Sequence, residues 1–134
     1  MIEATKKGLK NLLIDSSNSF NDAIGGRLYF VEADKFEGYP YAIINDVAPS
    51  TSRDSVSKLE QERFQVTIRD TGGTSANLGR IQQYLWDILD DAEKRLTVSG
   101  FQVVDCSREA PSGYQFRVEK VWHSVTQYRI LLQH

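Results

Sequence analysis

Hydrophobic and polar residues follow two different periods in the middle of the chain. From residue 63 to residue 69 every second side chain is apolar, which is typical of a strand with one buried face. Residues 70–74 interrupt this pattern with two glycines. From Ser75 onward apolar residues recur at helical spacing; these are Leu78, Ile81, Leu85, Ile88, Leu89 and Ala92. Residues 59–96 therefore predict one strand, a turn and one long amphipathic helix, with the Ser75 hydroxyl as its N-cap.

The chain before this unit predicts a helix, two short strands and a loop. Residues 2–14 place apolar side chains on one helical face, and residues 20–24 fit one further helical turn. Residues 27–32 and 39–44 predict strands, because they are rich in aromatic and branched side chains. Residues 48–58 consist mostly of serine, threonine, proline and charged residues, so we expect a long and mobile loop there.

The last third of the chain is rich in strand-forming residues. Residues 98–107 predict a strand and residues 108–113 a hairpin turn. Residues 114–133 are again strand-like but too long for one ordinary strand, so we expect a break near residues 122–123. The fold predicted for residues 1–134 is one α+β domain. It has a mostly antiparallel sheet of about five to six strands, with the N-terminal helix and the long helix packed on one face.

The composition narrows the class of protein without naming a function. Hydrophobic residues make up 40% and charged residues 25%, as in a globular domain. The net charge of -2 argues against a dedicated DNA-binding surface. Cys106 is the only cysteine, so no intramolecular disulfide forms, which fits a reducing compartment. We expect no signal peptide and no membrane span, because the chain shows no apolar segment that suits either.

The sequence Asp70-Thr71-Gly72 is the strongest candidate for catalysis. Retroviral-type aspartic proteases carry these three residues on a loop, where two chains supply the carboxylates. Here a polar residue, Arg69, precedes the aspartate and a long helix follows it, which disagrees with that class. A strand-to-helix turn explains the same residues, because an aspartate is favoured near a helix N-terminus. We therefore interpret the motif as a turn.

The other reactive residues also have simpler interpretations. Residues 72–75 could cradle a phosphate, but they lack both the P-loop ending and the dinucleotide-binding glycine pattern. His123 and one cysteine cannot build a zinc site without carboxylates or other chains, and Cys106 is most simply a small buried hydrophobe. The residues predict no catalytic, cofactor-binding or metal-binding site, and we expect the protein not to be an enzyme.

Aromatic and acidic residues flank the apolar stripe of the long helix. Tyr84 and Trp86 lie on opposite sides of the stripe, where they either cover the edge of the core or anchor a neighbouring subunit. The later turns of the helix are acidic, through Asp87, Asp90, Asp91 and Glu93. This acidity fits either a solvated face or a negative surface that faces a partner.

The order of these segments resembles that of a known family. It runs from Tyr-Pro-Tyr-Ala-Ile at residues 39–43 through the strand at residues 64–70 to the helix from Ser75. It closes with Trp-His-Ser at residues 122–124 and Tyr-Arg-Ile at residues 128–130. This succession, which covers nearly the whole chain, resembles the tail-terminator and tail-completion proteins of long-tailed bacteriophages, the group related to minor tail protein U.

The resemblance implies a structural virion protein. Such a subunit is made in the bacterial host cytoplasm and assembles into a ring, usually six-membered, at the head-proximal end of the tail. The ring stops polymerisation of the tail tube and joins the tail to the head. Its partners are further copies of itself, the tail-tube protein and head-tail connector proteins. It needs no cofactor, and DNA passes through its lumen without sequence-specific contacts.

The resemblance and the exposed segments together suggest where partners bind. The candidate interface residues are Tyr39, Tyr41, Arg53, Tyr84, Trp86, Arg108 and Glu109. Two alternatives stay open. Another neck component, such as a head-completion or head-tail connector protein, has a similar size and also lacks catalytic residues. A small regulatory domain that binds a metabolite would instead need a pocket with convergent polar groups.

Overall fold

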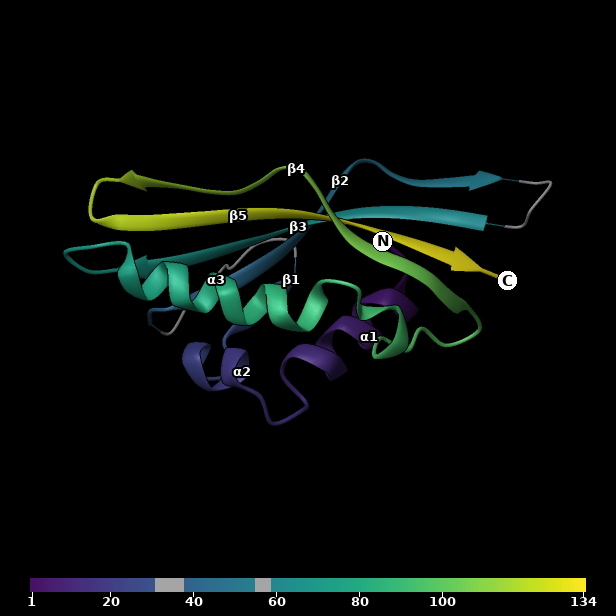
Figure 1. Ribbon diagram of the computed structural model, residues 1–134, viewed down its shortest axis with the longest axis horizontal. Helices are drawn as coiled ribbons and strands as arrows, with labels where there is room; N and C mark the ends of the chain where they lie inside the picture. Colours follow the sequence, from purple (N-terminus) through teal and green to yellow (C-terminus); the bar gives the residue numbers. More distant parts are fainter. Residues whose placement is uncertain (31–37, 55–58) are drawn as a thin grey trace.

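The computed structural model describes residues 1–30, 38–54 and 59–134, with the backbone alone for residues 48–54 and 111 (Figure 1). Its helices are α1 (Glu3–Leu13), α2 (Ser19–Ile24), α3 (Ala76–Leu89) and the short 3-10 helix η1 (Ala92–Lys94). Its strands are β1 (Leu28–Phe30), β2 (Tyr41–Asp54), β3 (Leu59–Thr71), β4 (Gln102–Val118) and β5 (Val121–Gln133).

The strands form one five-stranded sheet in the order β1-β2-β3-β5-β4. Every neighbouring pair is antiparallel except β1 and β2, which are parallel. The helices α1, α2 and α3 all lie below one face of the twisted sheet (Figure 1). The α+β class and the placement of both predicted helices on one face are therefore confirmed. On the other face, which we call the uncovered face, the described residues form no helix, and β1 and β4 are the two edge strands of the sheet.

Alternation along β3 and β5 places the core between sheet and helices. Phe64 and Tyr128 are fully buried and stack with ring centroids 5.6 Å apart. The apolar stripe of α3 packs against them through Leu78, Ile81, Leu85 and Leu89. Burial of each of these side chains stabilises the fold by roughly 2 kcal/mol. The contact between the apolar side chains of α3 and the sheet therefore holds the helix in place.

Helix α1 is fixed by one close backbone contact and one buried polar contact. A Cβ on Gly8 would lie 2.3 Å from the carbonyl oxygen of Thr97, so only glycine lets the helix approach this loop. The carboxylate of Glu62 accepts hydrogen bonds from the Thr5 hydroxyl (2.8 Å) and the Ile2 backbone N–H (3.2 Å). Burial raises the pKa of Glu62, because the charged form loses its hydration.

The long helix begins after the predicted N-cap residue, Ser75, but lacks the predicted capping bond and ends earlier than predicted. Ser75 is its N-cap residue, but its side chain accepts no capping hydrogen bond; the Thr74 hydroxyl instead accepts one from the Ala76 N–H at 3.3 Å. The helix ends at Leu89 rather than continuing toward residue 96. There the Arg95 guanidinium donates to the carbonyls of Ile88 (2.7 Å) and Asp90 (2.9 Å). These bonds satisfy carbonyls that a helix end leaves unpaired.

The predicted loop at residues 48–58 is wrong in its first part. Strand β2 continues to Asp54 and pairs again with β3 from Thr51↔Glu62 onward, after a register shift between residues 46 and 51. Pairing with β3 satisfies backbone groups that composition alone suggested would face water. Residues 55–58 lie outside the described residues, and the mobility of the segment stays a prediction.

The predicted hairpin turn at residues 108–113 is also wrong. That segment lies inside β4 and contains a register shift, and Gly113 there has φ +75°. The chain reverses at residues 119–120 instead, where Glu119 has φ +57° and β5 begins at Val121. A bulge can absorb glycine and proline within an edge strand, so these turn-forming residues did not have to end it. The strand break that the sequence predicts near residues 122–123 therefore lies at this turn, and β5 is continuous.

Candidate functional site

Tyr41 is packed inside the subunit by an aromatic cluster on the uncovered face. Its ring lies 5.9 Å from the ring of Tyr29 and 5.4 Å from that of Tyr39, centroid to centroid. The Arg69 guanidinium donates to the Tyr41 hydroxyl at 3.0 Å. Tyr41 is 2% exposed, whereas Tyr39 is half-buried. Of these two candidate interface residues, Tyr39 is the one that a partner can reach.

Trp86 and Arg108 belong to a polar network where α3 ends. The Arg108 guanidinium carbon lies 3.8 Å from the Trp86 ring centroid, and its Nε lies 3.0 Å from the Asp90 carboxylate. The Tyr128 hydroxyl donates to the same carboxylate at 2.9 Å. Burial is the main cause that raises the pKa of Tyr128, so its hydroxyl stays a donor. Asp90 is therefore tied into the subunit, which gives this acidic residue a structural role.

The remaining candidate residues are spread over both faces of the sheet. The carboxylate of Glu109, on β4, pairs with the Nε of Arg63, on β3, at 2.9 Å. Tyr84 lies half-buried between α2 and α3, where two adjacent open cavities share it. The side chain of Arg53 lies outside the described residues. The six candidates whose side chains are described thus do not gather into one site, and the part of all seven in an interface stays a prediction.

The exposed end of β4 is a feature that the sequence analysis missed. Tyr114, Phe116 and Val118 alternate on the uncovered face and are 46%, 39% and 53% exposed. The Phe116 ring stacks on His123 with centroids 4.9 Å apart and an interplanar angle of 2°. The alternating apolar residues at 114, 116 and 118 were the available signal, but the chain around them was interpreted as the start of a long strand. We call Tyr114, Phe116 and Val118 the hairpin patch.

The strand-to-helix turn holds Asp70 in a structural contact. Asp70 is 7% exposed, and its carboxylate accepts a hydrogen bond from the Asn77 side-chain amide at 2.9 Å. This bond ties the end of β3 to the first turn of α3, in agreement with the interpretation as a turn. A carboxylate so placed joins two elements and needs no chemical role to explain it.

Histidine and cysteine each occupy a packed position. Burial, followed by the charge of Arg69, lowers the pKa of His123. Burial raises the pKa of the Cys106 thiol to about 12, and its sulfur donates to the Leu89 carbonyl at 3.3 Å. The prediction that Cys106 is a small buried hydrophobe is confirmed, since it is 0% exposed. Among the described residues, no group of three or more histidine, cysteine, aspartate or glutamate side chains could hold a metal ion.

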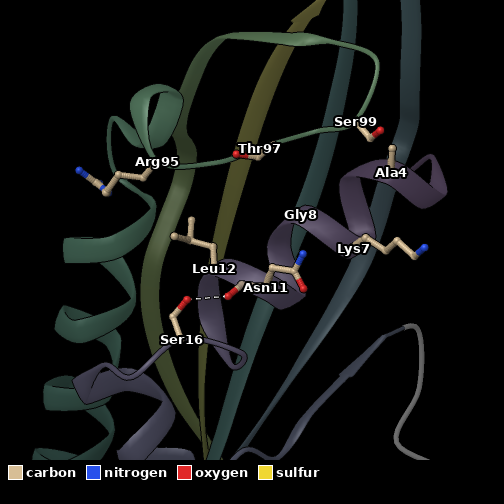
Figure 2. Close-up of a pocket in the computed structure, with 9 residues that line it drawn as sticks. All are labelled: Ala4, Lys7, Gly8, Asn11, Leu12, Ser16, Arg95, Thr97 and Ser99. Carbon is tan, nitrogen blue, oxygen red and sulfur yellow. Dashed lines mark hydrogen bonds between the residues drawn. The ribbon is translucent and has the colours of Figure 1, made fainter.

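One further cavity, of about 340 Å³, lies between α1 and the loop at residues 97–99 (Figure 2). Figure 2 shows Lys7 and Arg95 on opposite sides of it, with their side chains pointing outward. Arg95 is already bonded to carbonyls at the end of α3, and the Ser16 hydroxyl donates to the Asn11 carbonyl at 2.8 Å. In a small-molecule site, polar groups converge on the ligand. The polar groups drawn in Figure 2 do not converge on one point.

The fold of this chain is similar to the folds of two protein chains in solved structures. One chain in the virion of a native gene transfer agent particle matches with a TM-score of 0.75 and 13% sequence identity, covering 99% of this chain and all of that one. A second solved protein, whose name states no function, matches with a TM-score of 0.70 and 12% identity over 98% of this chain and 95% of its own. No family model matches the sequence, and no curated protein matches it. No helix in the described part of the chain is long and apolar enough to cross a membrane. The two structural matches show a shared fold.

Proposed function

We propose that the protein is a structural component of a phage-like virion that forms a ring at the head-proximal end of the tail. The ring would stop growth of the tail tube and join the tail to the head. Its partners would be further copies of this chain, the tail-tube protein and head-tail connector proteins. The proposed role needs no catalysis and no cofactor.

The observation that carries this proposal is the match to a chain of the gene transfer agent virion. That match extends over 99% of this chain and all of the other, so the whole architecture is shared rather than one common motif. The order of segments from residues 39–43 to residues 128–130 independently resembles the tail-terminator family. Because one fold can host several functions, the position within the virion needs its own test.

The experiment is deletion of the gene from the phage-like element that encodes it. We expect tails of abnormal length and separate, DNA-filled heads, because tube growth is no longer stopped and the joining surface is lost. Supplying the chain from a second copy of the gene should restore tail length. Electron microscopy of the particles measures both effects.

The same experiment distinguishes the alternative neck component. A head-completion or connector protein would leave tails of normal length when it is deleted, and the purified protein would bind heads that carry the portal. Binding to the ends of isolated tail tubes instead would support the proposed role. Normal tails together with normal joining would overturn a role at this position.

A further inference from the structure

We propose that the cavity between α1 and the loop at residues 95–99 binds an extended, acidic segment of a partner protein. This cavity has a volume of about 340 Å³ and is open to solvent on one side of the helix layer (Figure 2). We call it the α1 cleft. The proposed contact uses the carboxylates and the backbone of the partner segment, and it does not depend on where in a virion the protein lies.

The charged residues that line the α1 cleft are both basic. Lys7 is exposed on α1, and Arg95 is exposed on the loop. None of the nine lining residues is an aspartate or a glutamate. Within the described part of the chain, neither Lys7 nor Arg95 forms an ion pair. The cleft therefore presents two uncompensated positive charges, and a partner that carries negative charges complements them.

Arg95 is held in place without using all of its donors. Its Nη2 atom donates to the carbonyls of Ile88 at 2.7 Å and Asp90 at 2.9 Å. Its Nε and Nη1 atoms form no hydrogen bond with the described residues. A guanidinium that is already fixed at one nitrogen has less freedom to lose when it binds a partner. Its remaining nitrogens suit a carboxylate, because hydrogen bonds between two charged groups are the strong ones.

The loop offers backbone groups to an extended chain. Leu96 and Val98 are 4% and 2% exposed, whereas Thr97 and Ser99 are exposed. This alternation is that of a strand, although residues 95–99 belong to no strand of the sheet. Within the described part of the chain, the N–H groups of Thr97 and Ser99 form no backbone hydrogen bond. Unpaired N–H groups beside a cleft are the groups that an added peptide strand bonds.

The placement of the two cations favours a segment over a small anion. Figure 2 shows Lys7 and Arg95 on opposite sides of the cleft, with their side chains pointing outward. They do not converge on one point, as the polar groups of a small-molecule site do. An extended segment that crosses the cleft passes both cations, and the aliphatic side chains of Ala4 and Leu12 line its path. The arrangement therefore fits a chain with carboxylates spaced along it.

The test is the binding of two short fluorescent peptides to the full chain, measured by fluorescence anisotropy at moderate salt. In one peptide glutamate alternates with serine, and in the other glutamine alternates with serine. We expect the glutamate peptide to bind roughly tenfold more tightly, because only its carboxylates form charge-assisted hydrogen bonds with the two cations. Equal affinity of the two peptides, or no binding of the glutamate peptide, would overturn the proposal.

Two lysine variants on α1 locate the contact. Lys7→Glu should weaken binding of the glutamate peptide roughly tenfold, because a repulsion replaces an attraction. Lys10→Glu is the matched control, because Lys10 is exposed on the same helix but does not line the cleft. Salt screens charges that do not touch the peptide, so this variant should lose far less affinity. Equal losses in the two variants would mean attraction to net charge alone and would overturn the proposed site.

Nuclear magnetic resonance signals of the backbone amides then report on the loop. The glutamate peptide should shift the amide signals of Thr97 and Ser99 and leave those of Tyr114 and Val118, in the hairpin patch, unchanged. Unchanged signals at Thr97 and Ser99 would contradict the proposed contact. A short DNA duplex is the second probe, because its phosphates are also negative. If the duplex shifts the same signals and binds as tightly as the glutamate peptide, the proposal of an acidic protein segment is wrong.

Discussion

The Arg108 guanidinium stacks on the indole of Trp86, with 3.8 Å between its central carbon and the ring centroid. This contact joins β4 to α3, and the Asp90 carboxylate holds the guanidinium from the side at 3.0 Å. A planar cation suits this position, because it can lie flat on the ring while its edge bonds a carboxylate. The two residues were predicted as separate interface candidates, and the structure makes them one internal contact.

Arg108→Ala should lower the free energy of unfolding by about 1 kcal/mol, the scale of a partly exposed cation-π contact with an added ion pair. Arg108→Lys should recover only part of this loss, because an ammonium keeps the charge but cannot stack as a plane. Urea unfolding of the three proteins measures the difference. Equal stability of the alanine variant and the natural chain would show that the contact contributes nothing.

Gly113→Ala should destabilise the fold by roughly 2 kcal/mol. The new Cβ would lie 2.6 Å from a Trp86 ring carbon, and Gly113 has φ +75°, where L-residues are strained. Gly100→Ala is the control, because its φ is +87° but nothing lies within 4 Å of its Cβ position. The difference between the two variants isolates the clash with Trp86. Thermal unfolding should therefore give a lower midpoint for the Gly113 variant than for the Gly100 variant.

Gly8→Ala and Gly79→Ala should change stability in opposite directions. Both glycines lie inside helices, where alanine is intrinsically favoured by about 1 kcal/mol. At Gly79 the new Cβ meets only the Gln115 side chain, at 3.5 Å, so the helix preference should prevail and the protein should become more stable. At Gly8 the new Cβ would lie 2.3 Å from the Thr97 carbonyl oxygen, so α1 must move away and stability should fall. Stabilisation by both changes would contradict the close approach of α1.

Glu62 should make the natural chain lose stability as pH rises from about 4.5. Its folded-state pKa is raised from 4.5, mainly by burial, so in this range the folded chain holds a proton that the unfolded chain has released. Stability must fall wherever the folded state binds more protons. Below pH 4.5 both states are protonated and the penalty is absent.

The variant Glu62→Gln cannot ionise and should not show this loss, while its amide oxygen can still accept the bond from Thr5. Urea unfolding at a series of pH values measures the free energy of unfolding of both proteins. From acidic to neutral pH this free energy should fall more for the natural chain than for the variant. Glu3→Gln is the control, because the Glu3 side chain is 84% exposed. Parallel pH curves for the natural chain and Glu62→Gln would contradict the raised pKa.

Much of the fold follows from local pattern. The strand at residues 63–69 and the helix after Ser75 carry their period in their own side chains, so the predicted elements form where they were expected. The ends of these elements were predicted less well from the local pattern. Ser75 is the N-cap residue but makes no capping bond through its side chain, and the helix stops at Leu89, where Arg95 donates to the carbonyl of Ile88.

The candidate site was less predictable than the fold. Tyr41, Trp86 and Arg108 are the kinds of residue that anchor interfaces, and the same chemistry lets them pack within one subunit. The exposed hairpin patch went unnoticed because its exposure depends on where β4 lies in the sheet. A residue's type does not say whether its strand is central or at an edge.

The sequence by itself determined the elements whose periodicity is local: two amphipathic helices, the alternating central strand and an α+β class. Tertiary structure alone decided that residues 48–54 and 108–113 belong to strands, because β2 and β4 resume pairing with β3 and β5 after the register shifts in these segments. It also decided that Gly8 must be glycine and that Tyr114, Phe116 and Val118 stand exposed. These features depend on which segments meet in space, and a one-dimensional pattern records only what each residue prefers near its own position.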